Sequence, residues 1–224
     1  MQVKEQSDNI DNNNNNINNN KIEKTHVLAI DCRIDPESKR CFWIAAVVYP
    51  KDGDKVKGNF TFNGILDWDK TPMEDSIFGE KIVPYAKRCL ELDKTDRRFP
   101  NRFCTYKEML THLYCFFLKH CSYCDVITDY SSYGIEKLFG ECDSLYEPIG
   151  AASIHPEPLF DISKMLTERG FYANTSREAF ISEHACSLIP ADWTEKCFDP
   201  LYGAFATLSI YLVLAQPRKK ATQQ

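Results

Sequence analysis

The sequence predicts an α/β protein in which helices pack against a mixed β-sheet. Three strand-like segments come first along the chain, and strands then alternate with helices. This order implies a mixed sheet that is covered by helices. With 224 residues, of which 43% are apolar, the chain can bury one full-sized core or two small ones.

The predicted sheet begins with three neighbouring strands that would form an antiparallel meander. The segment "THVLAID" at 25–31 reads as a buried strand that ends in an acid, and "CFWIAAVVYP" at 41–50 is the second strand. The segment "GNFTFNG" at 58–64 alternates like a third strand. Two later pieces complete a set of five: "CDVITDY" at 124–130 and the short extended start of 157–170.

Five helices are predicted from the spacing of apolar residues. They are 107–121, 131–142, the later part of 157–170, 176–189 and 199–217. Ser131 or Ser132 would cap the second helix, and Gly170 would close the third. The last helix would open near Pro200 and stop before Pro217.

The chain reads as one domain between two polar tails. Residues 1–23 are rich in asparagine and have no apolar face to bury, so we expect a disordered tail. A prion-like assembly segment is the alternative for this tract. Residues 218–224 form the second tail, and 24–217, without a repeat or a clear linker, form the domain.

Composition and charge exclude several classes of protein. The net charge of −5 gives no general attraction to nucleic acid or to an anionic membrane, although a local basic strip can exist. The first twenty residues lack the apolar core of a signal peptide, so the ten cysteines read as reduced thiols in the cytoplasm. The apolar stretch 201–215 is shorter than the roughly 20 residues of a bilayer span, so no membrane partner is expected.

The cysteines include a lone Cys-x-x-Cys, formed by Cys121 and Cys124. Structural zinc normally needs two such half-sites, and a thioredoxin-type pair opens a helix after a strand. Neither context is present in the sequence. We therefore interpret the cysteines as packing thiols, with zinc binding and redox chemistry as the alternatives.

Four segments carry a resemblance to a known family. They are "LAIDCRI" (28–34), "VITDYSSYGIEKLF" (126–139), "HPEPLFDISKML" (155–166) and "CFDPLYGAFATLSIYL" (197–212). In order and spacing they resemble the DEDD superfamily of 3′-5′ exonucleases, which have the RNase-H-like fold. The resemblance implies a mixed five-stranded sheet, an antiparallel meander followed by parallel strands, flanked by helices.

The resemblance also implies a two-metal site for Mg²⁺ or Mn²⁺, held by four acids from separate elements. Matched by position, Asp31 fits the first acid, and Arg33 stands where a glutamate belongs. Gly134 falls at the second aspartate and Gly203 at the last, and Phe198 replaces a histidine. An arginine cannot bind a metal ion. On this alignment the two-metal site cannot assemble.

Three hypotheses follow from this alignment. The first is a degenerate exonuclease-like domain without normal catalysis or cofactor, which binds nucleic acid or a protein partner. The second is an active Mg²⁺- or Mn²⁺-dependent exonuclease with a relocated site, in which Asp31 binds metal and Asp129 and Asp199 supply the other acids. A purely structural role is the alternative for each of these acids. Asp199 would cap a helix, Asp129 would lie in a turn, and Asp31 would pair with Arg33 or another cation. The third hypothesis is a structural or assembly protein that keeps only the fold.

The basic segment "KTDRRFPNRFCTYK" at 94–107 is a candidate surface for single-stranded nucleic acid. It interleaves Arg97, Arg98 and Arg102 with aromatic residues, and such surfaces stack bases on rings and pair cations with phosphates. A solvated loop before the next helix is the alternative. Arg33 is a further candidate, since an arginine at the metal position can contact a phosphate directly.

Overall fold

The computed structural model describes the central part of the chain with several gaps. The described residues are 23–35, 39–53, 60–67, 79–96, 98–129, 132–150, 153–156, 158–171, 180–181, 188 and 199–215. Nearly all of both predicted tails, Arg97, Phe198 and most of the predicted helix 176–189 lie outside them.

A mixed sheet with the strand order β4-β3-β2-β1-β5-β6 forms the centre of the described structure. The strands are β1 (His26–Ile34), β2 (Cys41–Pro50), β3 (Phe60–Leu66), β4 (Asn101–Phe103), β5 (Cys124–Thr128) and β6 (Leu159–Asp161). Strands β1, β2 and β3 form the antiparallel meander, and β5 and β6 continue the sheet parallel to β1. The predicted α/β class, with a meander followed by parallel strands, is confirmed.

The number of strands differs from the prediction of five. Strand β4 is the sixth strand and pairs in parallel with β3. It lies in the basic segment 94–107, for which a nucleic-acid surface and a solvated loop are the two interpretations of the sequence. It has three residues, too few to show an alternating pattern. Tertiary packing holds it in place, because the ring of Phe103 is buried and stacks on Phe62 at a centroid distance of 6.1 Å.

Strand β1 does not end at Asp31, as the sequence suggested. It continues to Ile34, with Asp31 paired to Ala45 and Arg33 paired to Trp43 of β2, and the register shifts between Arg33 and Ile34. Residues two apart in a strand face the same side. The opposite charges of Asp31 and Arg33 therefore lie together, and the strand can continue through both without a lone buried charge.

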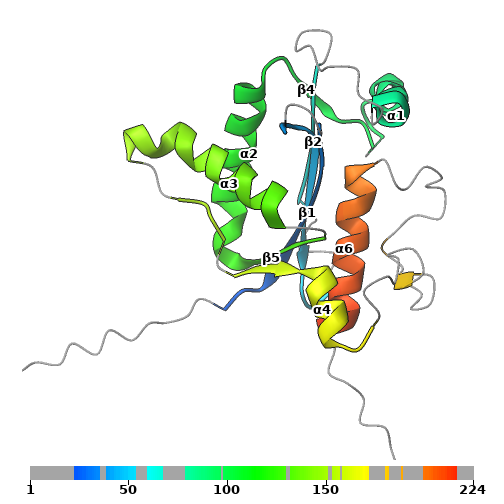
Figure 1. Cartoon of the computed structure of the whole chain (residues 1–224), viewed down its shortest axis with the longest axis vertical. Coiled ribbons are helices and arrows are strands. Elements are labelled where there is room, and N and C mark those ends of the chain that lie inside the picture. Colours follow the sequence, from blue (N-terminus) through cyan, green and yellow to red (C-terminus); the bar gives the residue numbers. More distant parts are fainter. Residues whose placement is uncertain are drawn as a thin grey trace, which may run out of the picture.

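Helices cover both faces of the sheet (Figure 1). Helices α2 (Tyr106–His120) and α3 (Ser132–Tyr146) lie on one face, and α4 (Ile162–Glu168) and α6 (Pro200–Ala215) lie on the other. Alternate residues of β1 pack into two core clusters, one on each face of the sheet. Leu28 packs on the side of α2 and α3, and Val27 packs on the side of α6. The helices predicted at these four places are confirmed.

Helix α1 (Gly79–Glu91) was not expected from the sequence, and it contains Pro84, which disfavours a helix interior. It lies near the N-terminal end of α6 (Figure 1). Its residues Ile82, Tyr85 and Ala86 are buried in the core, so tertiary packing stabilises it. None of the helices that the structure describes is both long and apolar enough to cross a membrane.

Candidate functional site

Asp31 and Arg33 form a buried ion pair at the position of the expected metal site. Arg33 Nη1 donates to Asp31 Oδ1 at 2.9 Å, and the side chains of Arg33 and Asp31 are only 10% and 9% exposed. The backbone N–H of Cys32 donates to the same carboxylate oxygen at 2.8 Å, and Arg33 also donates to the Cys32 carbonyl. The acid that the sequence matched to the first position of the family pattern, Asp31, is therefore paired with a cation of the same strand, Arg33.

Gly203 of α6 lies directly against this carboxylate. A Cβ atom at position 203 would overlap Asp31 Oδ2 and stand 2.6 Å from Asp31 Cγ. A separation below 3.0 Å is essentially never seen for a real Cβ, so even an alanine would force a shift. The carboxylate of Asp31 thus fills the space where the last aspartate of the family pattern would begin.

Gly134, at the position of the second aspartate, packs against an apolar side chain. A Cβ atom at this residue would clash with Cδ1 of Ile34. Ile34 comes directly after the register shift in β1. No atom of the Asp31 carboxylate lies within 4 Å of that Cβ atom, so Gly134 is not a neighbour of the acid as Gly203 is.

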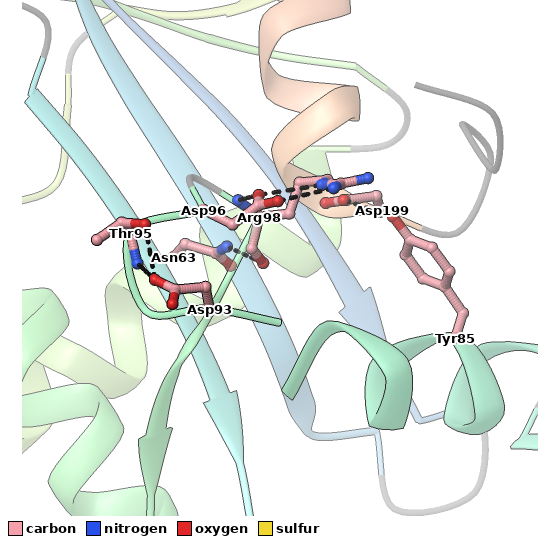
Figure 2. A network of polar contacts seen from close by, with 7 residues as sticks. All are labelled: Asn63, Tyr85, Asp93, Thr95, Asp96, Arg98 and Asp199. Atoms are coloured by element: carbon pink, nitrogen blue, oxygen red, sulfur yellow. Dashed lines mark hydrogen bonds and ion pairs between the residues drawn. The ribbon is translucent and has the colours of Figure 1, made fainter. Parts of the chain in front are cut away.

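Asp199 is fully buried at the start of α6 and caps this helix. Its Oδ1 accepts from the Leu201 N–H at 2.8 Å, and its carbonyl accepts from the Gly203 N–H at 3.0 Å. The hydroxyl of Tyr85 in α1 donates to Asp199 Oδ2 at 2.8 Å (Figure 2). The predicted cap is confirmed, and the additional bond links α1 to the start of α6.

Asp129 follows β5 and lies one strand away from Asp31. Because Ile30 pairs with Thr128, the two acids come directly after neighbouring positions of parallel strands. Asp129 Oδ1 accepts a hydrogen bond from Ser163 Oγ at 3.1 Å. Nowhere in the described residues do three or more His, Cys, Asp or Glu side chains gather so that they could hold a metal ion. The catalytic roles of Asp31, Asp129 and Asp199 stay predictions.

The candidate arginines that the structure describes each have a carboxylate partner. Arg98 binds Asp96 through two bonds, Nε to Oδ1 at 3.0 Å and Nη2 to Oδ2 at 2.7 Å (Figure 2). Arg102 Nη2 lies 3.0 Å from Asp67 Oδ2, and its side chain is 48% exposed. Arg102 is therefore the most accessible of the described candidates, and Arg33 is the least. Their role in binding nucleic acid stays a prediction.

A buried hydrogen-bonded path fixes the segment that carries Arg98. Trp43 Nε1 donates to Asn63 Oδ1 at 2.9 Å. Asn63 Nδ2 in turn donates to the carbonyl of Arg98 at 3.2 Å (Figure 2). The ring of Trp43 stacks on Tyr85 at a centroid distance of 5.9 Å. Sequence reasoning missed Trp43 and Asn63, since each is a single polar side chain in a mainly apolar strand.

One signal in the sequence could have identified the two ion pairs. Asp31 and Arg33 are separated by one residue, and so are Asp96 and Arg98. In both places the structure pairs the acid with the arginine of the same Asp-x-Arg triplet. Read as a local ion pair, this spacing predicts a neutralised acid at Asp31.

The Cys-x-x-Cys pair consists of thiols with strongly raised pKa values. Burial raises the pKa of Cys121 to about 12 and that of Cys124 to about 12. Such thiols stay protonated at neutral pH, and the nucleophile and metal ligand is the thiolate. The protonated state agrees with the interpretation as packing thiols.

The comparisons with known proteins find a likeness among solved structures alone. No protein-family model matches the chain, and no curated protein matches it. The chain is similar to a solved structure described as "3'-end specific recognition of histone mRNA stem-loop by 3'-exonuclease". The TM-score is 0.45 and the sequence identity 10%, over 86% of this chain and 81% of that chain. We take nothing about function from a likeness at this level, and the fold rests on the strand order given above.

Proposed function

We propose that this chain is a degenerate exonuclease-type domain that has lost two-metal catalysis and binds single-stranded nucleic acid. The proposed loss of catalysis is supported by one observation, the packing of the Asp31 carboxylate between Arg33 and Gly203. The ligand class comes from the resemblance in the sequence and from the accessible guanidinium of Arg102.

Electrostatics support the loss of catalysis. Two-metal hydrolysis needs carboxylates from several elements around two divalent cations. At Asp31 a guanidinium, which stays protonated at any accessible pH, already neutralises the carboxylate at 2.9 Å. A metal ion at this position would have to displace the arginine and leave its charge buried without that partner, which is unfavourable.

One observation favours an alternative function. Asp31 and Asp129 follow paired positions of neighbouring parallel strands, as the acids of a metal site would. The alternative is an active exonuclease that uses Asp31, Asp129 and Asp199 with Mg²⁺ or Mn²⁺. It requires that Arg33 move away and that Asp199 give up its role as helix cap.

The experiment that tests the proposal measures trimming and binding on the same samples. Single-stranded RNA and DNA are labelled so that shortening from the 3′ end is seen, and are incubated with the protein and Mg²⁺ or Mn²⁺. Asp31→Asn is the control. We expect no shortening by either protein, together with retained binding of the oligonucleotide.

Each other outcome has a defined meaning. Shortening that Asp31→Asn abolishes would establish the active alternative and overturn the proposal. Shortening that persists unchanged in the variant would point to a contaminating nuclease, which a second purification removes before the assay is repeated. No shortening and no binding would leave the third hypothesis, a structural or assembly protein, and would also overturn the proposal.

A further inference from the structure

We infer that a strip of rings at the end of the sheet opposite Asp31 is the surface that binds single-stranded nucleic acid. The strip consists of Phe60, His120, Tyr123 and His26. The inference rests on the proposed function and gives that function a location. His26 and Asp31 are five residues apart on β1, which corresponds to about 16 Å along a strand.

The four rings form one continuous row, with one ring each from β3, α2, the turn after α2 and β1. The ring centroids of Phe60 in β3 and His120 in α2 are 5.0 Å apart, and the rings are tilted by 33°. Tyr123, in the turn after α2, is 5.7 Å from His120 and 5.1 Å from His26 at the start of β1. The row therefore has a fixed geometry, since each ring contacts the next.

Exposure is concentrated at the Phe60 end of the row. Phe60 is 41% exposed, although phenylalanine is among the residues most often buried. Leu118, next to Lys119 in α2, is 51% exposed, and these two are the only large hydrophobic residues classed as exposed in the described part of the chain. His26 and Tyr123 are half-buried, and His120 is buried, so His120 holds the neighbouring rings in place and offers no face to a base.

A cation lies over the exposed ring. The ammonium group of Lys119 is 5.4 Å from the centroid of Phe60. Arg33, Arg98 and Arg102 each have a carboxylate partner. Among the described residues, by contrast, no carboxylate forms an ion pair with Lys119. The charge of Lys119 is therefore available to a phosphate.

This combination favours a single-stranded nucleic acid over a protein or a duplex. Unpaired bases stack on aromatic rings regardless of sequence, and cations beside the rings meet the phosphates. A base that stacks on Phe60 would displace Lys119 from the ring, and this contact is weak at an exposed site. The released ammonium group can then bind the adjacent phosphate.

The test compares variants that separate ring stacking from apolar contact. Binding of fluorescent single-stranded RNA and DNA oligonucleotides is measured by anisotropy over a series of salt concentrations. The variants are Phe60→Leu, which removes the ring but keeps an apolar side chain, Phe60→Tyr, which keeps the ring, and Lys119→Gln. Leu118→Ala is the matched control, since it truncates an apolar residue that is also exposed and has no ring.

We expect about tenfold weaker binding for Phe60→Leu, the loss of one stacked base, and binding close to the unchanged protein for Phe60→Tyr and Leu118→Ala. Lys119→Gln should lower the slope of log affinity against log salt by about 0.7, the value for one phosphate contact on a single strand. Circular dichroism and thermal unfolding confirm that each variant folds.

The outcomes separate this inference from the proposed function. If the unchanged protein binds and Phe60→Leu binds equally well, the strip is not the binding surface, while the proposed function stands. If Leu118→Ala weakens binding as much as Phe60→Leu does, the patch acts by apolar contact, as in a protein interface, and the inference is wrong. If the unchanged protein binds neither oligonucleotide, the proposed function itself fails.

Discussion

The carboxylate of Asp31 and the α-carbon of Gly203 are packed so closely that a Cβ atom at position 203 would stand 2.6 Å from Asp31 Cγ. Only glycine fits at position 203 without a shift, because the Asp31 carboxylate occupies the space of a Cβ atom. The carboxylate itself is held between Gly203 and Arg33. An RNase-H-like metal site would place a second carboxylate where this contact lies. The contact and the ion pair together form an internal structural element at this position.

Substituting Gly203 should therefore be costly. Gly203→Ala should lower the free energy of unfolding by about 3 kcal/mol or more, because it overpacks a buried site and disturbs a buried ion pair. Urea denaturation measures the change. Gly140→Ala is the matched control, since Gly140 is also in a helix, and nothing lies within 4 Å of a Cβ atom there. The control should be slightly more stable than the unchanged protein.

The cause can be assigned by combining this substitution with Asp31→Ala. If the new methyl group clashes with the Asp31 carboxylate, Gly203→Ala should lower the free energy of unfolding less in the Asp31→Ala background than in the unchanged protein. Equal costs in both backgrounds would show that Asp31 is not the group that limits the space at position 203.

Removal of Arg33 should destabilise the protein far more than removal of Arg98. Arg33→Met leaves the buried carboxylate of Asp31 without its guanidinium, and we expect a loss of about 3 kcal/mol. Arg98→Met breaks the second Asp-x-Arg pair, whose side chains are 33% and 25% exposed. It should cost about 1 kcal/mol or less, because solvent screens an exposed pair. Similar losses for both variants in urea denaturation would argue against the buried ion pair.

The hydroxyl of Tyr85 should contribute to stability through Asp199. Tyr85→Phe removes the hydrogen bond to a fully buried carboxylate, so a loss of about 1–3 kcal/mol is expected. Tyr49→Phe is the control, since Tyr49 is also buried and its hydroxyl makes no hydrogen bond with the described residues. Thermal or urea unfolding that does not distinguish the two variants would show that this bond does not hold α1 to α6.

The thiols should differ in their reactivity toward iodoacetamide. Burial is the main cause that raises the pKa of Cys89 and of Cys142 to about 12. At pH 8 only roughly one such thiol in 10,000 is a thiolate, which is the reactive form. Cys104 and Cys115 are exposed and should be modified before these buried thiols. Mass spectrometry of the native protein identifies the order, and early modification of Cys142 would contradict the packing around it.

The sequence predicted the order of elements better than the local geometry of the site. The spacing of apolar residues identified β1, β2, β3 and α6. Each of these elements either has apolar residues that repeat at the strand or helix spacing or is apolar and buried along its whole length. The spacing did not identify β4, because three residues are too few to show a pattern. It also did not identify α1, whose buried residues repeat at the helix spacing but whose interior contains Pro84. The six-stranded sheet exceeds the predicted five-stranded one because β4 was missed.

Within the site, alignment to the family pattern singled out Asp31, Arg33 and Gly203, but it could not show that Gly203 lies against the Asp31 carboxylate. That contact depends on how closely α6 approaches β1, which is a property of the packed structure. The role of Asp199 as a helix cap was predicted from the following proline, whereas its bond to Tyr85 joins residues 114 positions apart and has no local signal.

The most direct test of the proposed loss of the metal site is a titration of the protein with Mn²⁺, followed by electron paramagnetic resonance of the free ion. It is performed on the unchanged protein and on Asp31→Asn. We predict that both proteins leave the same amount of free Mn²⁺ at every concentration, because Arg33 already neutralises Asp31. Uptake of one or two Mn²⁺ ions per chain by the unchanged protein, with loss of that uptake in Asp31→Asn, would contradict the account.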